Sequence, residues 1–277
     1  MKMTEIIKDA FLFPTKHSGR YAIYLLLTSL AVLFTFGGIL TYAFGIINSV
    51  NYLTGGIYVI IALLIACIIA GYHINVIKSG INLDDKVPVF KLYEDFMTGF
   101  DNLVVLLFYF LIPAIIVILV GYDTKLFANI IAVGQEIILQ IFNVYIMGES
   151  VNIAVNAISH ALNNFLGSLV ITITAAFVLF IIFSFLQSLG EARLANTGSL
   201  KEALNIFESA KDIKKIGIFK VILSLALVSV IIGGIELVIT IIFNHNPFLE
   251  STFIILITPY FVLVTKRAIG LLYSNIT

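Results

Sequence analysis

Residues 71–100 read GYHINVIKSGINLDDKVPVFKLYEDFMTGF, a charged stretch between two long apolar runs. The run before it ends near Ile77, and a proline follows at position 88. Proline is tolerated in the first turn of a helix because its missing N–H would be unpaired there. From Val89 onward, apolar residues recur every three or four positions and charged residues fall on the opposite face. We therefore predict an amphipathic interfacial helix over residues 88–101, between two membrane spans.

The composition of the whole chain also indicates a membrane protein. Of its 277 residues, 60% are hydrophobic and 12% are charged, and the mean hydropathy is +1.09. A soluble domain is about 45–50% apolar and about 25% charged. Basic and acidic residues are equal in number, which argues against a nucleic-acid-binding surface. The partner that the composition predicts is therefore the lipid bilayer.

Six apolar segments are long enough to cross the hydrocarbon core, which takes about 20 helical residues. They cover approximately residues 21–47, 53–77, 103–120, 166–189, 216–243 and 253–272. We therefore predict an all-α fold class. The expected architecture is a polytopic integral membrane helical bundle with six transmembrane helices, in a single membrane domain over residues 1–277.

The basic residues predict the orientation of these spans, because short cytoplasmic loops retain Lys and Arg. In the six-span arrangement, all Lys and Arg residues except Lys125 fall on one side of the membrane. We expect that side to be the cytoplasm. The N- and C-termini are then cytoplasmic, and the protein lies in the cell membrane.

Residues 122–165 are harder to place. The segment 126–147 is apolar but contains polar side chains, and residues 148–165 contain no Lys or Arg. We expect residues 122–165 to form an outer-face excursion of helices that lie on the outer leaflet or dip into it. The alternative is an eight-span arrangement, in which 126–147 and 148–165 form a transmembrane hairpin.

The amphipathic pattern of residues 88–101 recurs at two other places. Residues 3–13 carry a shorter version before Pro14, and residues 199–213 begin with a capping box formed by Ser199 and Glu202. We predict inner elbow helices at 3–13, 88–101 and 199–213, each leading into an outward and an inward span. This order suggests a three-fold helical-hairpin repeat. Ordinary polar connectors between helical hairpins would explain the same pattern.

Three stretches resemble one known family. The stretch GYHINVIKSG with the following VPVFKLYEDFMTGF resembles its first connector, and residues 190–223 resemble its second connector. The stretch TPYFVLVTKRAIGLLY resembles its C-terminal signature, with Arg267, Gly270 and Tyr273 in place. The family is the archaeal-rich group of polytopic membrane proteins numbered as domain of unknown function 4013. The resemblance implies a six-span bundle in an archaeal membrane, and it implies no established activity.

One acidic residue lies inside a predicted span. Glu236 stands in IIGGIELVITIIF, roughly 10 Å from the outer end of the span at 1.5 Å per residue. An ionisable residue inside a membrane is by default a hypothesis of a functional site. We group it with a second polar cluster, formed by Lys125, Gln135, Glu136 and Gln140. The alternative is that Glu236 is neutral or bonded to nearby polar groups, and that the cluster is simply solvated.

Small side chains at helical spacing predict where helices pack closely. The candidates lie on the first, second and fifth spans: Gly37, Thr41 and Gly45; Ala62, Ala66 and Ala70; Gly233 and Gly234. Close packing of the first two spans is the simplest explanation of the first two sets. Oligomer contact is the alternative.

The sequence predicts no enzyme and no cofactor, because it lacks nucleophile, phosphate-loop and metal-ligand motifs. We expect a scaffold or accessory component of a membrane complex, which docks a membrane-protein partner or a second copy of itself. The docking surface would be the inner connectors or the outer helices. The competing hypothesis is a small transporter or channel for a lipid, ion or small solute, with an outer-leaflet polar cavity around Glu236.

Overall fold

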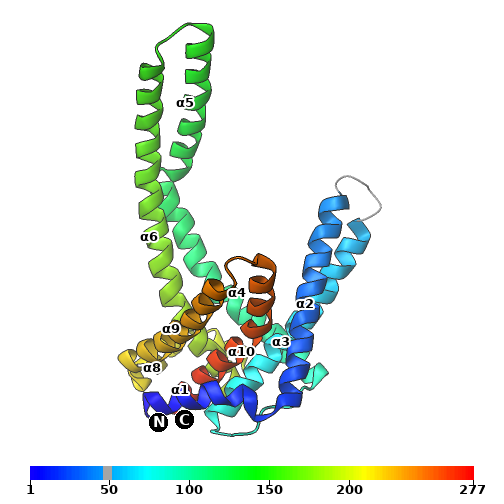
Figure 1. Ribbon diagram of the computed structural model, residues 1–277. Coiled ribbons are helices and arrows are strands. Elements are labelled where there is room, and N and C mark those ends of the chain that lie inside the picture. The colour runs from blue at the N-terminus through cyan, green and yellow to red at the C-terminus, as the bar shows by residue number, and fades with distance from the viewer. Residues whose placement is uncertain (46–51) are drawn as a thin grey trace. The chain divides into compact units, whose positions relative to one another are not determined.

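The computed structural model describes residues 1–45 and 52–277, in which helices are joined by turns and short loops (Figure 1). This confirms the predicted all-α class. Residues 46–51 lie outside the described residues, and they include the predicted end of the first span. The helices are α1 Met3–Leu12, η1 Phe13–Lys16, α2 Ser18–Gly45, α3 Tyr52–Ile81, α4 Leu92–Asp123, α5 Leu126–Ile146, α6 Val151–Thr197, α7 Leu200–Ala203, α8 Ile206–Ile216, α9 Ile218–Phe243 and α10 Pro247–Tyr273.

Among the described residues, seven helices are long and apolar enough to cross a membrane: α2, α3, α4, α5, α6, α9 and α10. Six of them overlap the predicted spans, and the seventh is α5, inside the predicted excursion. Large apolar side chains are exposed along all seven helices. Contiguous apolar surface of this extent needs lipid as its solvent. The chain is a multi-pass helical membrane protein.

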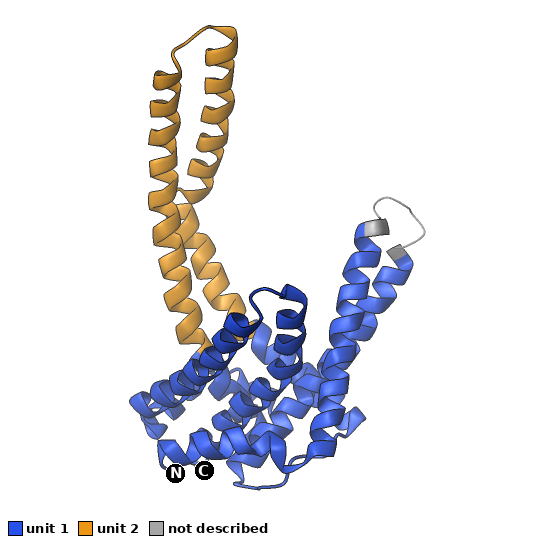
Figure 2. Cartoon of the chain, in the orientation of Figure 1, with its two compact units in different colours: residues 1–107, 185–277 blue, residues 108–184 orange. Residues whose placement is uncertain are grey.

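The chain divides into two compact units, which are described one by one (Figure 2). Unit 1 comprises residues 1–107 and 185–277, and unit 2 comprises residues 108–184. The helices α4 and α6 each contribute residues to both units.

Unit 2 is an antiparallel helical hairpin. One limb is formed by residues 108–123 of α4 followed by α5, and the other limb is formed by residues 151–184 of α6. As the first limb advances from α4 into α5, its contacts fall on successively earlier residues of α6. This nested order shows that α5 continues in the direction of α4. They pair Phe110 with Phe180, Thr124 with Thr172, and Asn129 with Ser168. The first limb changes direction only locally, at Lys125, whose φ is +58°.

The predicted boundary between residues 165 and 166 falls inside α6. No proline occurs between Val151 and Thr197, and a side chain at Gly167 would meet nothing within 4 Å. The amphipathic segment 151–165 therefore continues into the apolar segment without a break. Within unit 2, residues 151–184 extend about 50 Å, which exceeds the hydrocarbon core of roughly 30 Å.

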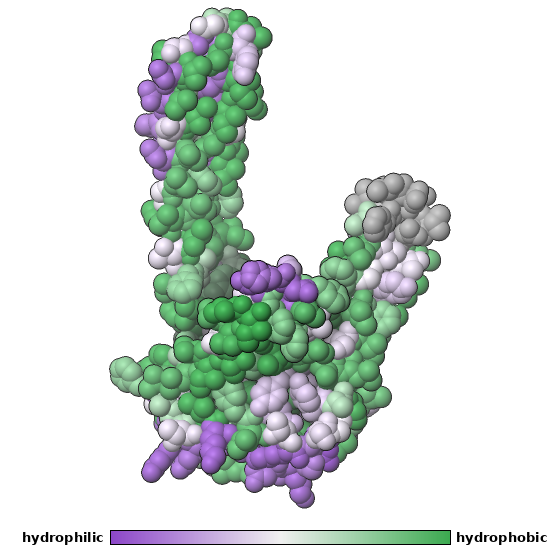
Figure 3. Space-filling view, in the orientation of Figure 1, coloured by the Kyte–Doolittle hydropathy of each residue, from purple (hydrophilic) through white to green (hydrophobic). Residues whose placement is uncertain are grey.

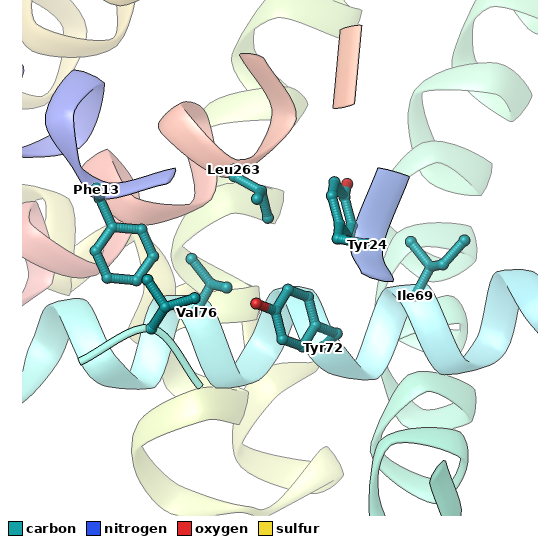
Figure 4. Close-up of a cluster of buried hydrophobic side chains, with 7 residues drawn as sticks. Phe13, Tyr24, Ile69, Tyr72, Val76 and Leu263 are labelled. Atoms are coloured by element: carbon teal, nitrogen blue, oxygen red, sulfur yellow. The ribbon is translucent and has the colours of Figure 1, made fainter. Parts of the chain in front are cut away.

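The buried core of unit 1 joins helices from both ends of the sequence. Its side chains come from η1, α2, α3, the connector between α3 and α4, and α10 (Figure 4). They are Phe13, Tyr24, Ile69, Tyr72, Val76, Val87 and Leu263. The ring of Phe90 stacks on that of Tyr72 at 3.8 Å between centroids. This stacking holds the connector against α3.

Glycine allows α3 and α4 to cross with their backbones in contact. A methyl group on Gly71 of α3 would overlap the carbonyl of Asp95, and one on Gly99 of α4 would overlap the carbonyl of Cys67. Small residues permit such close approach where no hydrophobic force drives membrane helices together. The crossing therefore requires glycine on both helices.

The predicted elbow helices have different bounds in the structure. The first is α1, while the second begins at Leu92, not Pro88, because the Asp95 carboxylate accepts the N–H of Lys91 at 2.7 Å and sets the helix start. The third is divided into α7 and α8, because Asn205 caps a new helix by accepting the N–H of Glu208.

Candidate functional site

In unit 1, hydrophilic residues gather at the end that carries both termini, whereas the helices above this end are apolar (Figures 1 and 3). The amino group of Met1 donates to Oδ1 of Asn275 at 3.0 Å, so the two termini lie side by side. Several charged side chains at this end are paired with one another, and Glu191, Arg193, Asp212 and Arg267 among them are buried. We call them the ionic cluster: Asp9, Lys16, Asp85, Glu191, Arg193, Asp212, Lys266 and Arg267.

Arg267 of α10 lies at the centre of one part of this cluster, and it is only 1% exposed. Its Nε donates to Oδ2 of Asp9 at 2.8 Å. Its Nη1 donates to Oγ of Ser79 at 3.2 Å and to the carbonyl oxygen of Asp84 at 2.8 Å. The guanidinium also lies 4.4 Å from the ring centroid of Phe13. One side chain thus joins α1, η1, α3 and the following connector to α10.

Lys16 extends this part of the cluster. Its Nζ lies 2.8 Å from Oδ1 of Asp9 and 2.6 Å from Oδ1 of Asp85. Burial alone would raise the pKa of Asp9, but the hydrogen bonds from Lys16 and Arg267 hold that pKa below its usual range. Burial would lower the pKa of Lys16, but its bonds to Asp85 and Asp9 raise it. Both side chains are therefore charged at neutral pH.

A second ion pair joins α6 to α10. Glu191 is only 1% exposed, and its two oxygens lie 2.7 and 2.5 Å from Nζ of Lys266. A buried carboxylate is stable only when it is paired. This contact therefore fixes the last turns of α6 against α10 within unit 1.

Arg193 forms the third part of the cluster. Its Nη1 lies 2.6 Å from Oδ2 of Asp212 in α8, and its Nη2 lies 2.6 Å from Oε2 of Glu202 in α7. The hydroxyl of Tyr273 donates to the same oxygen of Asp212 at 3.0 Å. The short helices α7 and α8 are thus bound to α6 and α10 by charge-assisted bonds, which are stronger than neutral ones.

The distribution of charge along the sequence placed Arg193, Lys266 and Arg267 on one membrane face, and their ion pairs were not predicted. The one sequence signal for these ion pairs was the presence of acidic residues in the same polar connectors. Two of the three residues quoted from the C-terminal signature have clear roles, since Arg267 and Tyr273 belong to the ionic contacts. The third, Gly270, allows α10 to meet α3, because a methyl group there would overlap the backbone of Ile77.

The predicted polar site is divided between the two units. Glu236 lies on α9 in unit 1 and is half-buried, one turn before Thr240, which donates to Glu250 at 3.0 Å. Among the described residues, the Glu236 side chain has no hydrogen-bond or ion-pair partner. It continues the buried stripe of α9 that contains Leu225 and Val228.

The other four residues of the predicted polar site belong to unit 2. Lys125 and Gln135 are exposed. Nε2 of Gln140 donates to Oε1 of Glu136 at 2.8 Å, so these two form one local pair. The Oε1 atom of Gln140 is buried and has no hydrogen-bond partner among the described residues.

The small residues predicted for helix packing have different surroundings. A methyl group on Gly37 would lie 3.5 Å from Tyr58 of α3, whereas Thr41 donates to the Gly37 carbonyl within α2. The backbones of α2 and α3 approach each other closely at Gly38 and Gly55, which were not among the predicted packing residues. Ala62 and Ala70 are buried and Ala66 is half-buried, while Gly233 and Gly234 face open space. The surroundings of Gly45 lie outside the described residues.

The fold and the ionic cluster define a class: a multi-pass helical membrane protein with a polar, internally paired end. The model of one family, Protein of unknown function (DUF4013), matches residues 54–244. The chain belongs to this family. The match includes residues 122–165 and ends before the C-terminal stretch 258–273. No curated protein and no solved structure matches the chain.

Proposed function

We propose that the protein is a non-enzymatic scaffold or accessory component of a membrane complex. The observation that supports this is the exposed apolar surface at the far part of the unit 2 hairpin, formed by residues 136–165. We call it the hairpin tip. Because the α6 limb within unit 2 is longer than the hydrocarbon core is thick, part of the hairpin lies beyond the hydrocarbon.

The hairpin tip exposes large apolar side chains on both limbs. Ile138 is 70% exposed and Tyr145 is 82% exposed on α5, and Val151 is 61% exposed on α6. Outside the hydrocarbon, apolar surface of this kind marks a contact with another protein. An apolar helical surface of a membrane-protein partner is the occupant that fits it.

Polar amides accompany the apolar residues of the hairpin tip. Hydrophilic residues gather along the first part of α6 (Figure 3), where Asn152, Asn156 and Asn163 are exposed. Neutral amides both donate and accept hydrogen bonds, and they hold no net charge that would repel a partner. The hairpin tip therefore combines apolar contact area with polar groups that can set the orientation of a partner.

The proposed topology has six crossings, because α4 and α5 form one limb of the hairpin. In this arrangement, both termini and the ionic cluster face the cytoplasm, as the distribution of Lys and Arg favours. The predicted location in an archaeal cell membrane and the three-fold helical-hairpin repeat remain part of this proposal.

Site-specific photo-crosslinking in native membranes tests the docking role. A photoreactive residue at position 141 of the hairpin tip is compared with one at position 241 of α9, since Ile141 and Ile241 are similarly exposed, at 54% and 62%. We expect position 141 to give one protein adduct of defined mass, and position 241 to give lipid adducts. The protein adduct is expected to disappear in the Ile138→Asn variant. Lipid adducts alone at both positions would contradict the proposal.

The alternative function is a small transporter or channel with Glu236 on its path. The half-buried carboxylate without a described partner is the observation in its favour. Such a path needs a polar cavity that reaches Glu236. Four cavities formed by the described residues have volumes of about 310, 450, 450 and 390 Å³, and Glu236 lines none of these four. The scaffold role is therefore the better supported of the two.

A further inference from the structure

A cavity of about 390 Å³ lies in unit 1 between the first turn of α2, the last turns of α3 and the connector that leads to α4. Basic side chains outnumber acidic ones in its lining. Four of them, Arg20, Lys78, Lys86 and Lys91, face two acidic ones, Asp84 and Glu94. The difference of four and two leaves a formal charge of +2 on the lining.

Among the described residues, three of the four basic side chains in this cavity have no salt-bridge partner. Lys91 is paired with Glu94 at 2.7 Å. The Asp84 carboxylate accepts the backbone N–H of Lys86 at 2.9 Å. The side chains of Arg20, Lys78 and Lys86 form no salt bridge within the part of the chain that the structure describes. Within the described ranges, the cavity therefore holds three cations without a salt-bridge partner, whereas the nearby ionic cluster is paired throughout.

The wall of the cavity is held in place by the core of unit 1. Val87 is only 2% exposed, and Phe90 stacks on Tyr72 at 3.8 Å. The hydroxyl of Tyr72 also donates to the carbonyl oxygen of Pro88 at 3.5 Å. A connector fixed in this way keeps its basic side chains near those of α2 and α3 before any ligand arrives. Such preorganisation lowers the entropic cost of binding.

The position of the cavity matches the depth of lipid headgroups. It lies where the apolar run of α3 ends and that of α2 begins, at the polar end of unit 1. Arg and Lys clusters bind phosphate oxygens by charge-assisted hydrogen bonds, and cations at a membrane surface attract anionic lipids. We propose that this cavity binds a phosphate group, carried by an anionic lipid or free in solution. The site is independent of the proposed scaffold role.

The test uses the full chain purified in a neutral detergent. Its thermal stability is measured while phosphatidylglycerol, phosphatidylcholine or inorganic phosphate is added. A variant with Arg20→Gln, Lys78→Gln and Lys86→Gln is compared with a control that carries Lys2→Gln, Lys201→Gln and Lys214→Gln. The control removes the same charge from exposed positions at the same end of the molecule.

We expect phosphatidylglycerol to stabilise the wild type and the control, and the cavity variant to bind it at least about tenfold more weakly. Phosphatidylcholine should have little effect on any of them. A response to inorganic phosphate alone, lost in the cavity variant only, identifies free phosphate as the source. Equal loss in both variants, or no response of the wild type, overturns the proposal.

A second measurement covers the case in which the cavity variant does not fold. Native mass spectrometry of the wild type and of the single variant Lys86→Gln counts the lipids retained from mixed micelles. We expect the wild type to retain phosphatidylglycerol in preference to phosphatidylcholine, and Lys86→Gln to retain less. No preference in the wild type would also overturn the proposal.

Discussion

The guanidinium of Arg267 donates to the carboxylate of Asp9 over 2.8 Å, although the two residues are 258 positions apart in the chain. The contact joins α1, the first helix, to α10, the last helix. Ile6 and Ala10 of the same first helix have no exposed surface. The elbow helix α1 is therefore part of the folded core of unit 1, and it does more than lie at the membrane interface.

The Arg267→Met variant should be strongly destabilised. It leaves Asp9 with Lys16 as its remaining charged partner, and it removes the donor that satisfies Ser79 and the Asp84 carbonyl. Breaking one side of a buried ion pair costs about 3–5 kcal/mol. The free energy of unfolding in detergent micelles measures this loss. The Lys91→Met variant breaks an exposed, solvent-screened pair and should lose far less. Equal losses in the two variants would contradict the structural role of Arg267.

The Gly71→Ala variant should separate α3 from α4. Its added methyl group would overlap the backbone of Asp95, which cannot move without displacing the helix. We expect a lower melting temperature and a less uniform gel-filtration profile. Gly56→Ala is the matched control on the same helix, because a methyl group there would meet nothing within 4 Å. A stable Gly71→Ala variant would show that the two helices do not cross as described.

Acid should weaken the contact between Asp9 and its basic partners. The pKa of Asp9 in the folded protein is below its usual value of 3.8, so folding favours the charged form. The resulting stabilisation is fully present above that value, and it is lost as the pH falls through the lowered pKa. We expect the wild type to melt at a higher temperature than Asp9→Asn at pH 7. The difference should shrink below about pH 4. A difference that does not change with pH would contradict this assignment.

The proposed topology predicts which positions a membrane-impermeant thiol reagent can reach in intact cells. In a Cys67→Ser background, cysteines at positions 91 and 211 should react only after the membrane is opened. A cysteine at position 147 of the hairpin tip should react from outside, because Met147 is 69% exposed. Labelling of position 91 or 211 in intact cells would invert the orientation, and labelling of all three would show that the membrane is not intact.

The Glu236→Gln variant should fold and assemble like the wild type if the protein is a scaffold. The substitution keeps the size of the side chain and replaces its ionisable carboxyl group by an amide. We expect a change in unfolding free energy within about 0.5 kcal/mol, as for substitutions away from packed or paired sites. The crosslinked adduct at position 141 should persist. A solute flux in proteoliposomes that depends on the carboxylate would instead favour the transporter.

The long apolar helices could be predicted because a long apolar run has few alternative structures. The predicted segment 216–243 and the helix α9, Ile218–Phe243, differ by only two residues at the start. The predicted segment 166–189 lies within α6, and this helix extends beyond it at both ends. The polar residues before it, such as Asn156 and Asn163, change the character of the surface without interrupting the backbone hydrogen bonds.

The ionic cluster could not be predicted from local patterns. Asp9 and Arg267 come from opposite ends of the chain, and no periodicity within either helix indicates the partner. The position of Arg267 also has a simpler explanation, because basic residues near span ends are expected at the cytoplasmic face. The pairing of Arg193 with Asp212 was hidden for the same reason.

The nested contacts of unit 2 limit how the length of this protein can change among relatives. Phe110 faces Phe180 and Thr124 faces Thr172 across the two limbs, so an insertion in one limb alone would shift every pair beyond it. Matched insertions or deletions of about seven residues, two helical turns, keep the same faces in contact. An alignment of homologues should therefore show length differences that occur in both limbs together, at equal distances from the loop that joins them.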